Sequence, residues 1–195
     1  RDTLVSQAAY VTFNKMLRDV CKRYFKDLEQ TIVFAEPFIF TTLGQDNPNV
    51  NYTRISELEQ VKKHLETCIE KSHHDGNPQA NLFLFDLSIR NVLKIVRLLQ
   101  MGHAIVVSEG GNGKQSLTKL AAYLLHYTVW RLDTSGMYGI QDLRNEIRDV
   151  SMKVGLRDES IVLMVTESTI VDEEFLVPVS EVLTTGDLRD AFTLE

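Results

Sequence analysis

The chain has 195 residues, of which 44% are hydrophobic and 25% charged, with a formal net charge of −6. This composition fits one globular core of ordinary size, or parts of two, and excludes a disordered linker. The acidic balance argues against a duplex nucleic-acid partner, which needs a basic face to displace counterions from phosphates. No apolar run approaches the roughly 20 residues that span a bilayer, and no signal peptide is visible, so we expect no membrane partner.

The two cysteines, Cys21 and Cys68, lie far apart without ligand spacing. They predict reduced thiols of a cytoplasmic protein rather than a disulfide framework. His73 and His74, with His64 or Cys68, raise the alternative of a metal site. Adjacent histidines seldom face one ion, and no second ligand pair follows at zinc spacing, so we favour solvated histidines.

The first 75 residues are predicted to be mainly helical. Apolar residues at helical spacing over residues 13–24 predict an amphipathic helix that packs on a neighbouring domain. Residues 31–40 are strand-like, but Pro37 demotes the second half to an edge or a turn. Residues 56–70 predict a second helix with an apolar inner stripe.

Residues 71–80 form the clearest linker in the chain, because Gly76, Asn77 and Pro78 break helices. We therefore expect two parts, a mainly helical one over residues 1–75 and a second one over residues 76–195. The chain begins without Met and stops without a tail, from which we expect both ends to be cut from something longer.

From Asn81 onward, strands and helices alternate, as is typical of an α/β domain with a parallel sheet. The first predicted elements are an apolar run at 82–85, a helix that Asp86 caps at its N-terminus, and a strand at 104–107 buried on both faces. A helix from Lys114, a strand at 128–132 and a helix at 140–154 follow. The last predicted elements are a buried strand at 161–165 and a helix that begins near residues 172–174.

A glycine-rich loop joins the predicted strand at 104–107 to the next helix. It contains the run Gly110, Gly111, Asn112, Gly113, Lys114, Gln115 and Ser116, close to the phosphate-loop pattern G-x-x-x-x-G-K-[ST]. Glycines let backbone N–H groups converge on phosphate oxygens, and the helix adds the positive end of its dipole. Lys114 would reach the β- and γ-phosphates of ATP, or the β-phosphate of ADP, while a hydroxyl would hold Mg²⁺.

Two residues of this phosphate loop (residues 108–115) depart from the pattern. Ser108 replaces the first glycine, and Gln115 stands at the Mg²⁺-binding hydroxyl position, with Ser116 one residue later. The alternative is a glycine-rich turn that binds no ligand. The apolar run before the loop and the amphipathic helix after it favour nucleotide binding, but they leave open whether this copy still binds.

Residues 110–117 closely resemble the GGSGKQSL loop typical of the fourth AAA+ module of axonemal dynein heavy chains, including the unusual Lys-Gln-Ser order. Other stretches similar to that family are residues 82–86, 116–122, 138–143 (the family's YGIPDL segment), 173–176 and 183–188. The likeness covers about residues 81–192. More weakly, the first eighty residues resemble the end of the preceding module.

The resemblance implies an AAA+ P-loop NTPase fold whose parallel sheet is incomplete here. It implies a regulatory nucleotide site within a ring of six AAA+ modules that drives a microtubule motor. The implied partners are the other modules of the same heavy chain, microtubules, and dynein intermediate and light chains. The implied location is the cytoplasm, the cytoskeleton and the ciliary axoneme.

Two other interpretations stay open beside this one. The first is a degenerate AAA+ module that packs in the ring without binding nucleotide. The second is a self-sufficient P-loop kinase or GTPase, but the chain has no guanine-reading N-K-x-D motif and no arginine-rich lid.

The resemblance also implies a Walker B strand that ends in Asp-Glu, where the Asp positions Mg²⁺ and the Glu polarises the attacking water. Here Glu167 matches the catalytic Glu, whereas Thr166 stands at the Asp position. Threonine offers Mg²⁺ a hydroxyl without a charge, so Ser116 and Thr166 would be weak metal ligands and hydrolysis would be slow or absent. An acid near the start of the next helix is an equal alternative for Glu167.

The family places an apolar run beside the adenine base, which implies a pocket role for Leu82 and Phe83, although a core role is the more common one. Asp133 could face the phosphates or cap a surface turn. In the implied strand order, the strand carrying the sensor residue separates the phosphate-loop strand from the Walker B strand and comes later in sequence. Because the chain ends at Glu195, we expect both strands to face a gap.

Overall fold

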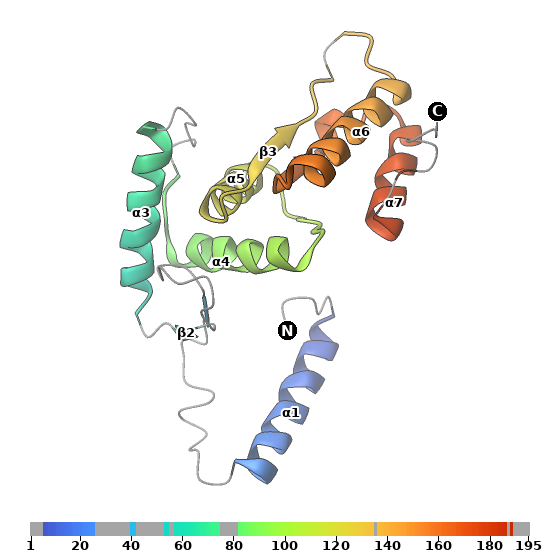
Figure 1. Ribbon diagram of the computed structural model, residues 1–195. Helices are drawn as coiled ribbons and strands as arrows, with labels where there is room; N and C mark the ends of the chain where they lie inside the picture. Colours follow the sequence, from blue (N-terminus) through green and yellow to red (C-terminus); the bar gives the residue numbers. More distant parts are fainter. Residues whose placement is uncertain are drawn as a thin grey trace. The chain divides into compact units, whose positions relative to one another are not determined.

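A computed structural model describes residues 6–25, 40–41, 53–54, 57–74, 82–134, 136–186 and 188. The chain divides into two compact units, Arg1–Leu98 and Leu99–Glu195. Figure 1 colours the first unit from blue to green and the second from green through yellow to red. The domain boundary expected between residues 75 and 76 lies outside the described residues.

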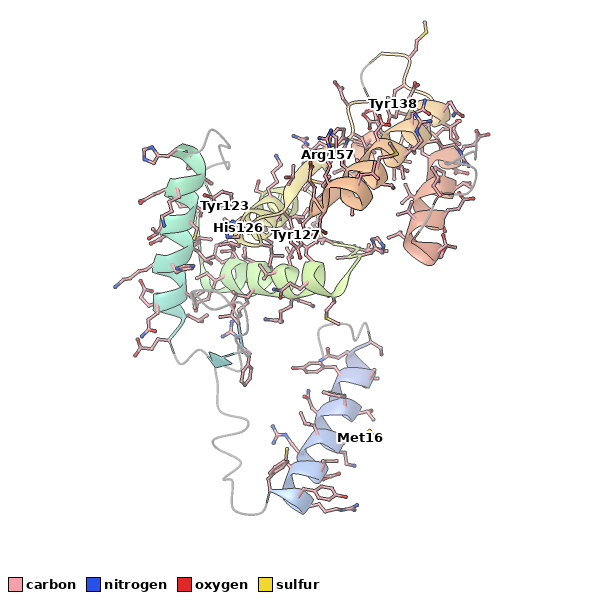
Figure 2. The ribbon with its side chains drawn as sticks, in the orientation of Figure 1. Met16, Tyr123, His126, Tyr127, Tyr138 and Arg157 are labelled. Atoms are coloured by element: carbon pink, nitrogen blue, oxygen red, sulfur yellow. The ribbon has the colours of Figure 1, made fainter. Side chains whose placement is uncertain are left out.

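Helix α1 (Gln7–Tyr24) is the amphipathic helix that the sequence predicts. None of its residues is buried, and the side chains of Met16 and Tyr24 are 62% and 70% exposed. Met16 is labelled on α1 in Figure 2. The neighbouring domain expected to cover this stripe therefore stays a prediction. Among the helices that the structure describes, none combines the length and the apolar composition needed to cross a membrane.

Among the described residues, a short antiparallel strand pair and helix α3 follow α1. Strand β1 (Phe40–Thr41) pairs with β2 (Thr53–Arg54), so the strand predicted at 31–40 is described only at its last residue. Helix α3 (Leu58–His74) buries Val61 and Leu65.

Helix α3 also corrects the predicted linker, because residues 71–74 continue the helix. The helix-breaking Gly76 and Pro78 come later in the sequence, and Lys71, His73 and His74 in the last turn complement the negative end of the helix dipole. His73 and His74 are exposed. Within the described ranges, no three His, Cys, Asp or Glu side chains gather as metal ligands would.

Helix α4 (Asp86–Met101) supplies most of the buried side chains of the first unit, including the predicted Ile89, Val92, Leu93 and Val96. Its start corrects the predicted cap. The N–H of Phe85 donates to Ser88 Oγ at 2.8 Å, and this hydroxyl donates to the carbonyl of Phe85 at 2.8 Å. Asp86 lies inside the first turn instead, where its charge complements the helix dipole.

The second unit contains a parallel strand pair joined by a helical crossover. Strand β3 (Thr128–Arg131) pairs with β4 (Ile161–Met164), from Thr128 opposite Ile161 to Arg131 opposite Met164. Parallel neighbours need a crossover connection, and α6 (Ile140–Arg157) provides it. The ammonium group of Lys153 on α6 lies 3.9 Å from the ring centre of Trp130 on β3. The α/β class with an incomplete parallel sheet is thus confirmed.

The prediction of a buried strand at residues 104–107 is wrong both about the strand and about its burial. These residues form no strand, and Ile105 and Val107 are 79% and 87% exposed. A strand buried on both faces needs neighbours on both sides, and no described residue pairs with this segment. The gap expected beside this segment stays a prediction.

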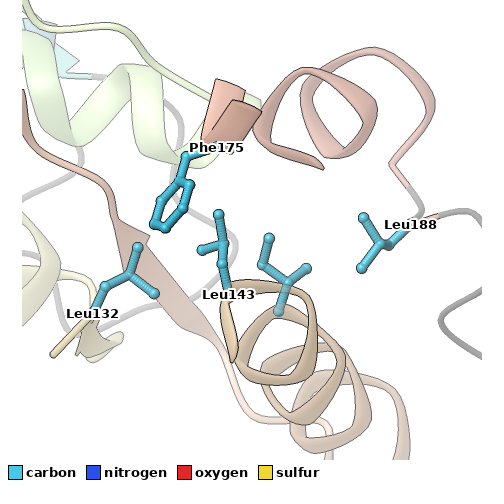
Figure 3. Close-up of a cluster of buried hydrophobic side chains, with 5 residues drawn as sticks. Leu132, Leu143, Phe175 and Leu188 are labelled. Carbon is cyan, nitrogen blue, oxygen red and sulfur yellow. The ribbon is translucent and has the colours of Figure 1, made fainter. Parts of the chain in front are cut away.

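The core of the second unit lies between α6, the end of β3 and the C-terminal helices. Leu132, Leu143, Ile147, Phe175 and Leu188 cluster there with little exposure (Figure 3). Phe175 ends the 3-10 helix η2 (Glu173–Phe175), which continues into α7 (Leu176–Thr185). The start predicted near residues 172–174 is confirmed, since Asp172 Oδ1 accepts a hydrogen bond from the N–H of Glu174 at 3.2 Å.

Helix α5 (Lys114–Leu124) ends in a two-bond cap that leads into β3. The N–H of Tyr127 donates to the carbonyl of Ala122 at 2.9 Å, and that of His126 to the carbonyl of Tyr123 at 3.0 Å, the pattern of a Schellman motif. His126 has φ 58, a left-handed conformation usually taken by glycine. Tyr123, His126 and Tyr127 gather at this end of α5 (Figure 2).

Candidate functional site

The phosphate loop takes its shape from two glycines in the left-handed region. Gly111 has φ 82 and Gly113 has φ 68, whereas Gly110 has no positive φ. A residue with a Cβ costs about 1–2 kcal/mol in this region, so glycine is favoured at positions 111 and 113. Gly113 is the N-cap of α5, and the chain turns there directly from the loop into the helix.

The start of α5 presents backbone donors that the helix itself does not use. Its first intrahelical bond runs from the N–H of Leu117 to the carbonyl of Gly113 at 2.9 Å, and no side chain caps the helix. The N–H groups of Lys114, Gln115 and Ser116 therefore have no acceptor within the helix. Together with the positive end of the helix dipole, such donors form a site for an anion.

Lys114 lies across the loop that it is predicted to serve. Its Nζ donates a hydrogen bond of 2.8 Å to the carbonyl oxygen of Ser108. Ser108, noted in the sequence only as a departure from glycine, thus takes part through its backbone, while its hydroxyl donates to the carbonyl of Glu109 at 3.3 Å. Sequence reasoning missed this bond, because a backbone carbonyl is present at every position and leaves no pattern.

The two residues that follow Lys114 differ in exposure. Gln115 is exposed, whereas Ser116 is half-buried. Leu117, Leu120 and Ala121 form the predicted buried face of α5. Gln115 therefore stands on the solvent side of the first turn, and Ser116 stands closer to the buried face.

The predicted Walker B residues lie in a tight turn, the Thr166 turn (residues 166–169), directly after β4. Thr166 caps the 3-10 helix η1 (Glu167–Thr169). The N–H of Thr166 donates to Thr169 Oγ1 at 2.9 Å, and this hydroxyl donates to the carbonyl of Thr166 at 2.8 Å. The hydroxyls of Thr166 and Ser168 also share a hydrogen bond of 2.9 Å.

Glu167, the predicted catalytic acid, is exposed on this turn. Sequence reasoning missed Ser168 and Thr169, whose hydroxyls hold the turn. Their signal was present, since threonine as an N-cap with a hydroxyl three residues later is a common way to close a turn.

The residues at the two predicted Mg²⁺ positions do not fit a magnesium site of the usual kind. Mg²⁺ prefers octahedral oxygen ligands that include one or two carboxylates. Gln115 and Thr166 are both neutral, and the hydroxyl of Thr166 is already paired with Ser168. Glu167 is the acid next to Thr166 in sequence, and its exposed side chain stands on the turn rather than among buried ligands.

The structure brings the two predicted parts of the site into one unit. Helix α5 contacts β3, and β4 pairs with β3. The phosphate loop at the start of α5 and the Thr166 turn at the end of β4 are therefore both connected to the same strand. Asp133 follows β3 and is exposed.

The predicted adenine contacts lie outside that unit. Leu82 is half-buried and Phe83 is 87% exposed, and both belong to the first unit, ahead of α4. Their role beside a base stays a prediction.

Comparison with known proteins adds independent evidence. Residues 80–195 match the family model of the P-loop-containing dynein motor region D4. The chain is 30% identical over 204 residues to the flagellar outer-arm dynein beta chain of Chlamydomonas reinhardtii, and 29% identical over 193 residues to the ciliary dynein beta chain of Tripneustes gratilla. It is 27% identical over 196 residues to dynein axonemal heavy chain 11 of Sus scrofa. These alignments cover 98–100% of the chain but 4% of each relative.

Proposed function

The chain belongs to the family of P-loop dynein motor regions of type D4, and from this membership we propose that it is a nucleotide-binding regulatory module of an axonemal dynein heavy chain. The observation that carries the proposal is the structure at the start of α5. Gly111 and Gly113 adopt left-handed conformations just before Lys114, and the N–H groups of residues 114–116 have no acceptor within the helix. That arrangement suits the phosphates of ATP or ADP.

In the proposed complex, the phosphates lie against the N–H groups of Gly111, Asn112, Gly113 and Lys114. The ammonium group of Lys114 leaves the carbonyl of Ser108 and turns to the β- and γ-phosphates. The residues predicted as Mg²⁺ ligands, Ser116 and Thr166, carry only neutral hydroxyls, so the cation would be held weakly at most. When bound, Mg²⁺ would neutralise part of the phosphate charge.

We assign Glu167 the role of polarising the attacking water, with slow or absent hydrolysis. Thr166 lacks the charge that positions Mg²⁺, and removing one group that stabilises a transition state costs about 2.7–4 kcal/mol, or a factor of about 10²–10³ in rate. A site that binds nucleotide and hydrolyses it slowly is suited to regulation rather than to the main power-generating step.

The proposal extends to the whole protein only through its relatives, because the chain spans 4% of their length. Their names place them in flagella, cilia and axonemes. We accordingly propose that the module works beside other AAA+ modules of one heavy chain and acts on microtubules through the complete motor. Intermediate and light chains would be further partners, in the cytoplasm, the cytoskeleton and the axoneme.

The second candidate function is a structural module that packs in the ring without binding nucleotide. It is favoured by the bond from Lys114 to Ser108, which satisfies the lysine without a ligand, and by the neutral residues Gln115 and Thr166. An experimental map of the complete motor, prepared with ATP or ADP, separates the two candidates. We expect phosphate density against residues 111–114, and a collapsed, empty loop would establish the structural module instead.

A further inference from the structure

We propose that this site binds its nucleotide without help from a divalent cation, so that Mg²⁺ adds little to the affinity for ATP or ADP. This inference rests on the proposed function. It follows from three features of the second unit: the exposed Gln115, the position of Ser116 and the paired hydroxyl of Thr166.

The first feature is the residue at the hydroxyl position of the phosphate loop. Gln115 is the second residue of α5, and its side chain is exposed. A carboxamide is neutral and carries no compact hydroxyl. It also adds two carbons of reach between the backbone and the oxygen, so it cannot hold a cation close against the phosphates as serine or threonine does.

The second feature is that Ser116 cannot take over this role. Successive residues of an α-helix are separated by about 100° around the axis. Ser116 therefore points away from the direction of residue 115, toward the buried face that contains Leu117 and Leu120, and it is half-buried. The hydroxyl of Ser116, one residue after the usual position, therefore does not point where the hydroxyl of residue 115 would point.

The third feature is the Thr166 turn. Thr166 Oγ1 shares a 2.9 Å hydrogen bond with Ser168 Oγ, so a cation at this oxygen would compete with Ser168 whenever Ser168 is the donor. In either arrangement the cation would gain only a neutral oxygen, and two bonds to Thr169 fix the backbone of Thr166 in its turn. Neither predicted cation position thus offers a charge.

The phosphates still have counter-charges. Lys114 supplies a full positive charge, and the N-terminus of α5 supplies about half a charge along with its N–H donors. None of these groups depends on a cation for its position, because the loop is shaped by Gly111 and Gly113. The binding of nucleotide is therefore expected to persist when divalent cations are removed.

A probe that reports on Lys114 alone can test this in the complete heavy chain, whose other nucleotide sites would obscure a bulk measurement. An acyl phosphate of ATP places a reactive acyl carbon beside a lysine that contacts the phosphates. The lysine amine attacks this carbon, an amide bond forms, the acyl–phosphate bond breaks and ATP leaves. Mass spectrometry of the peptide that contains Lys114 then measures the acylated fraction, and free ADP competes for the site.

We expect the ADP concentration that halves acylation of Lys114 to change by less than about threefold between excess Mg²⁺ and excess EDTA. For comparison, the loss of one charge-assisted hydrogen bond weakens binding by about tenfold to a hundredfold. Lys119 on the same helix is the internal control, and its acylation should not respond to ADP. In the double variant Gln115→Thr, Thr166→Asp, we expect EDTA to weaken competition by at least about tenfold.

The outcomes separate the inference from the proposed function. Loss of competition in EDTA for the unmodified chain would overturn the inference and leave nucleotide binding intact. A double variant that stays insensitive to EDTA would overturn the assignment to residues 115 and 166. If ADP never protects Lys114 with or without Mg²⁺, the proposed function itself fails, and the inference fails with it.

Discussion

The ammonium group of Lys114 and the backbone carbonyl of Ser108 are joined by a hydrogen bond of 2.8 Å that closes the phosphate loop on itself. The lysine that is predicted to bind phosphate is thereby held at the loop itself. A phosphate can replace the carbonyl as the acceptor with a gain, since a bond between two charged groups is stronger than one between a charged and a neutral group.

Replacing this lysine should separate binding from folding. We expect Lys114→Ala to lower the nucleotide content of the complete protein by one per chain, measured by chromatography of the denatured sample, because the loop loses its full positive charge. The β3–β4 pair should keep its amide protection, because the half-buried Lys114 lies in the loop and at the start of α5, not in either strand. Lys119→Ala is the matched control on the same helix. An equal nucleotide content in the parent protein, Lys114→Ala and Lys119→Ala would contradict the prediction.

The two ends of the glycine run should respond differently to alanine. A Cβ at Gly110 or at Gly113 would meet no atom within 4 Å, so available space does not distinguish them. Only Gly113 has a positive φ, and alanine there should cost about 1–2 kcal/mol. We expect Gly113→Ala to accelerate exchange of the Leu117 amide by about tenfold or more and to weaken nucleotide binding. Gly110→Ala should do neither, and identical behaviour of the two variants would refute the argument from φ.

Hydrolysis at this site should be limited by Thr166. With the other phosphate loops of the heavy chain disabled, we expect ATP turnover to be slow and Thr166→Asp to raise it by up to about 10²-fold, since it restores a charge to the Mg²⁺ position. The variant also removes the hydroxyl pair with Ser168, so Ser168→Ala is the control for that loss. Unmodified turnover equal to that of the main motor site would show that residues 115 and 166 do not limit the chemistry.

The start of α6 is held by Tyr138. Its hydroxyl donates to Glu146 Oε2 at 3.0 Å, and its ring centre lies 6.0 Å from that of Phe175 in the core. Figure 2 shows Tyr138 at the loop that leads into α6. Tyr138→Phe keeps the ring and removes the bond, which should cost about 1 kcal/mol. Faster amide exchange over residues 138–157 would report the loss, with Tyr127→Phe as the control.

The same pair gives a pH dependence with a defined sign. Burial, and then the bond to Glu146, raise the pKa of Tyr138 far above its usual value. The folded state therefore favours the neutral phenol, and its contribution is fully present below the unfolded pKa of about 10 and lost as the pH rises through the raised pKa. We expect the difference in protection between the parent and Tyr138→Phe to stay constant from about pH 6 to about pH 9. A decline within that range would contradict the pKa assignment.

Produced as 195 residues alone, the polypeptide should aggregate or melt without a sharp transition. Ile105 and Val107 are exposed although their residue types suit a buried strand, and exposed apolar segments without strand partners favour association. We expect strong binding of a hydrophobic dye and no ATPase activity, with less dye bound by the variant Ile105→Thr, Val107→Thr. A sharp thermal transition whose midpoint rises with ATP would refute this expectation.

The sequence was sufficient for features that are decided locally. The helices α4, α5 and α6 were predicted because their apolar residues repeat every three to four positions, and helix bonds connect residues four apart. The phosphate loop was predicted from the pattern of glycines before Lys114, and two of these glycines, Gly111 and Gly113, adopt the positive φ that glycine takes most readily. The parallel order of β3, α6 and β4 follows from the alternation itself.

Only the tertiary structure showed the features that depend on residues distant in sequence or on the position of backbone atoms. Residues 104–107 have the composition of a buried strand, but a strand exists only where a neighbour supplies its hydrogen bonds. The acceptor of Lys114 is a carbonyl that no residue type encodes. Thr166 was predicted as a weak metal ligand, yet its hydroxyl is paired with Ser168, because a hydroxyl takes whichever partner the folded turn brings within reach.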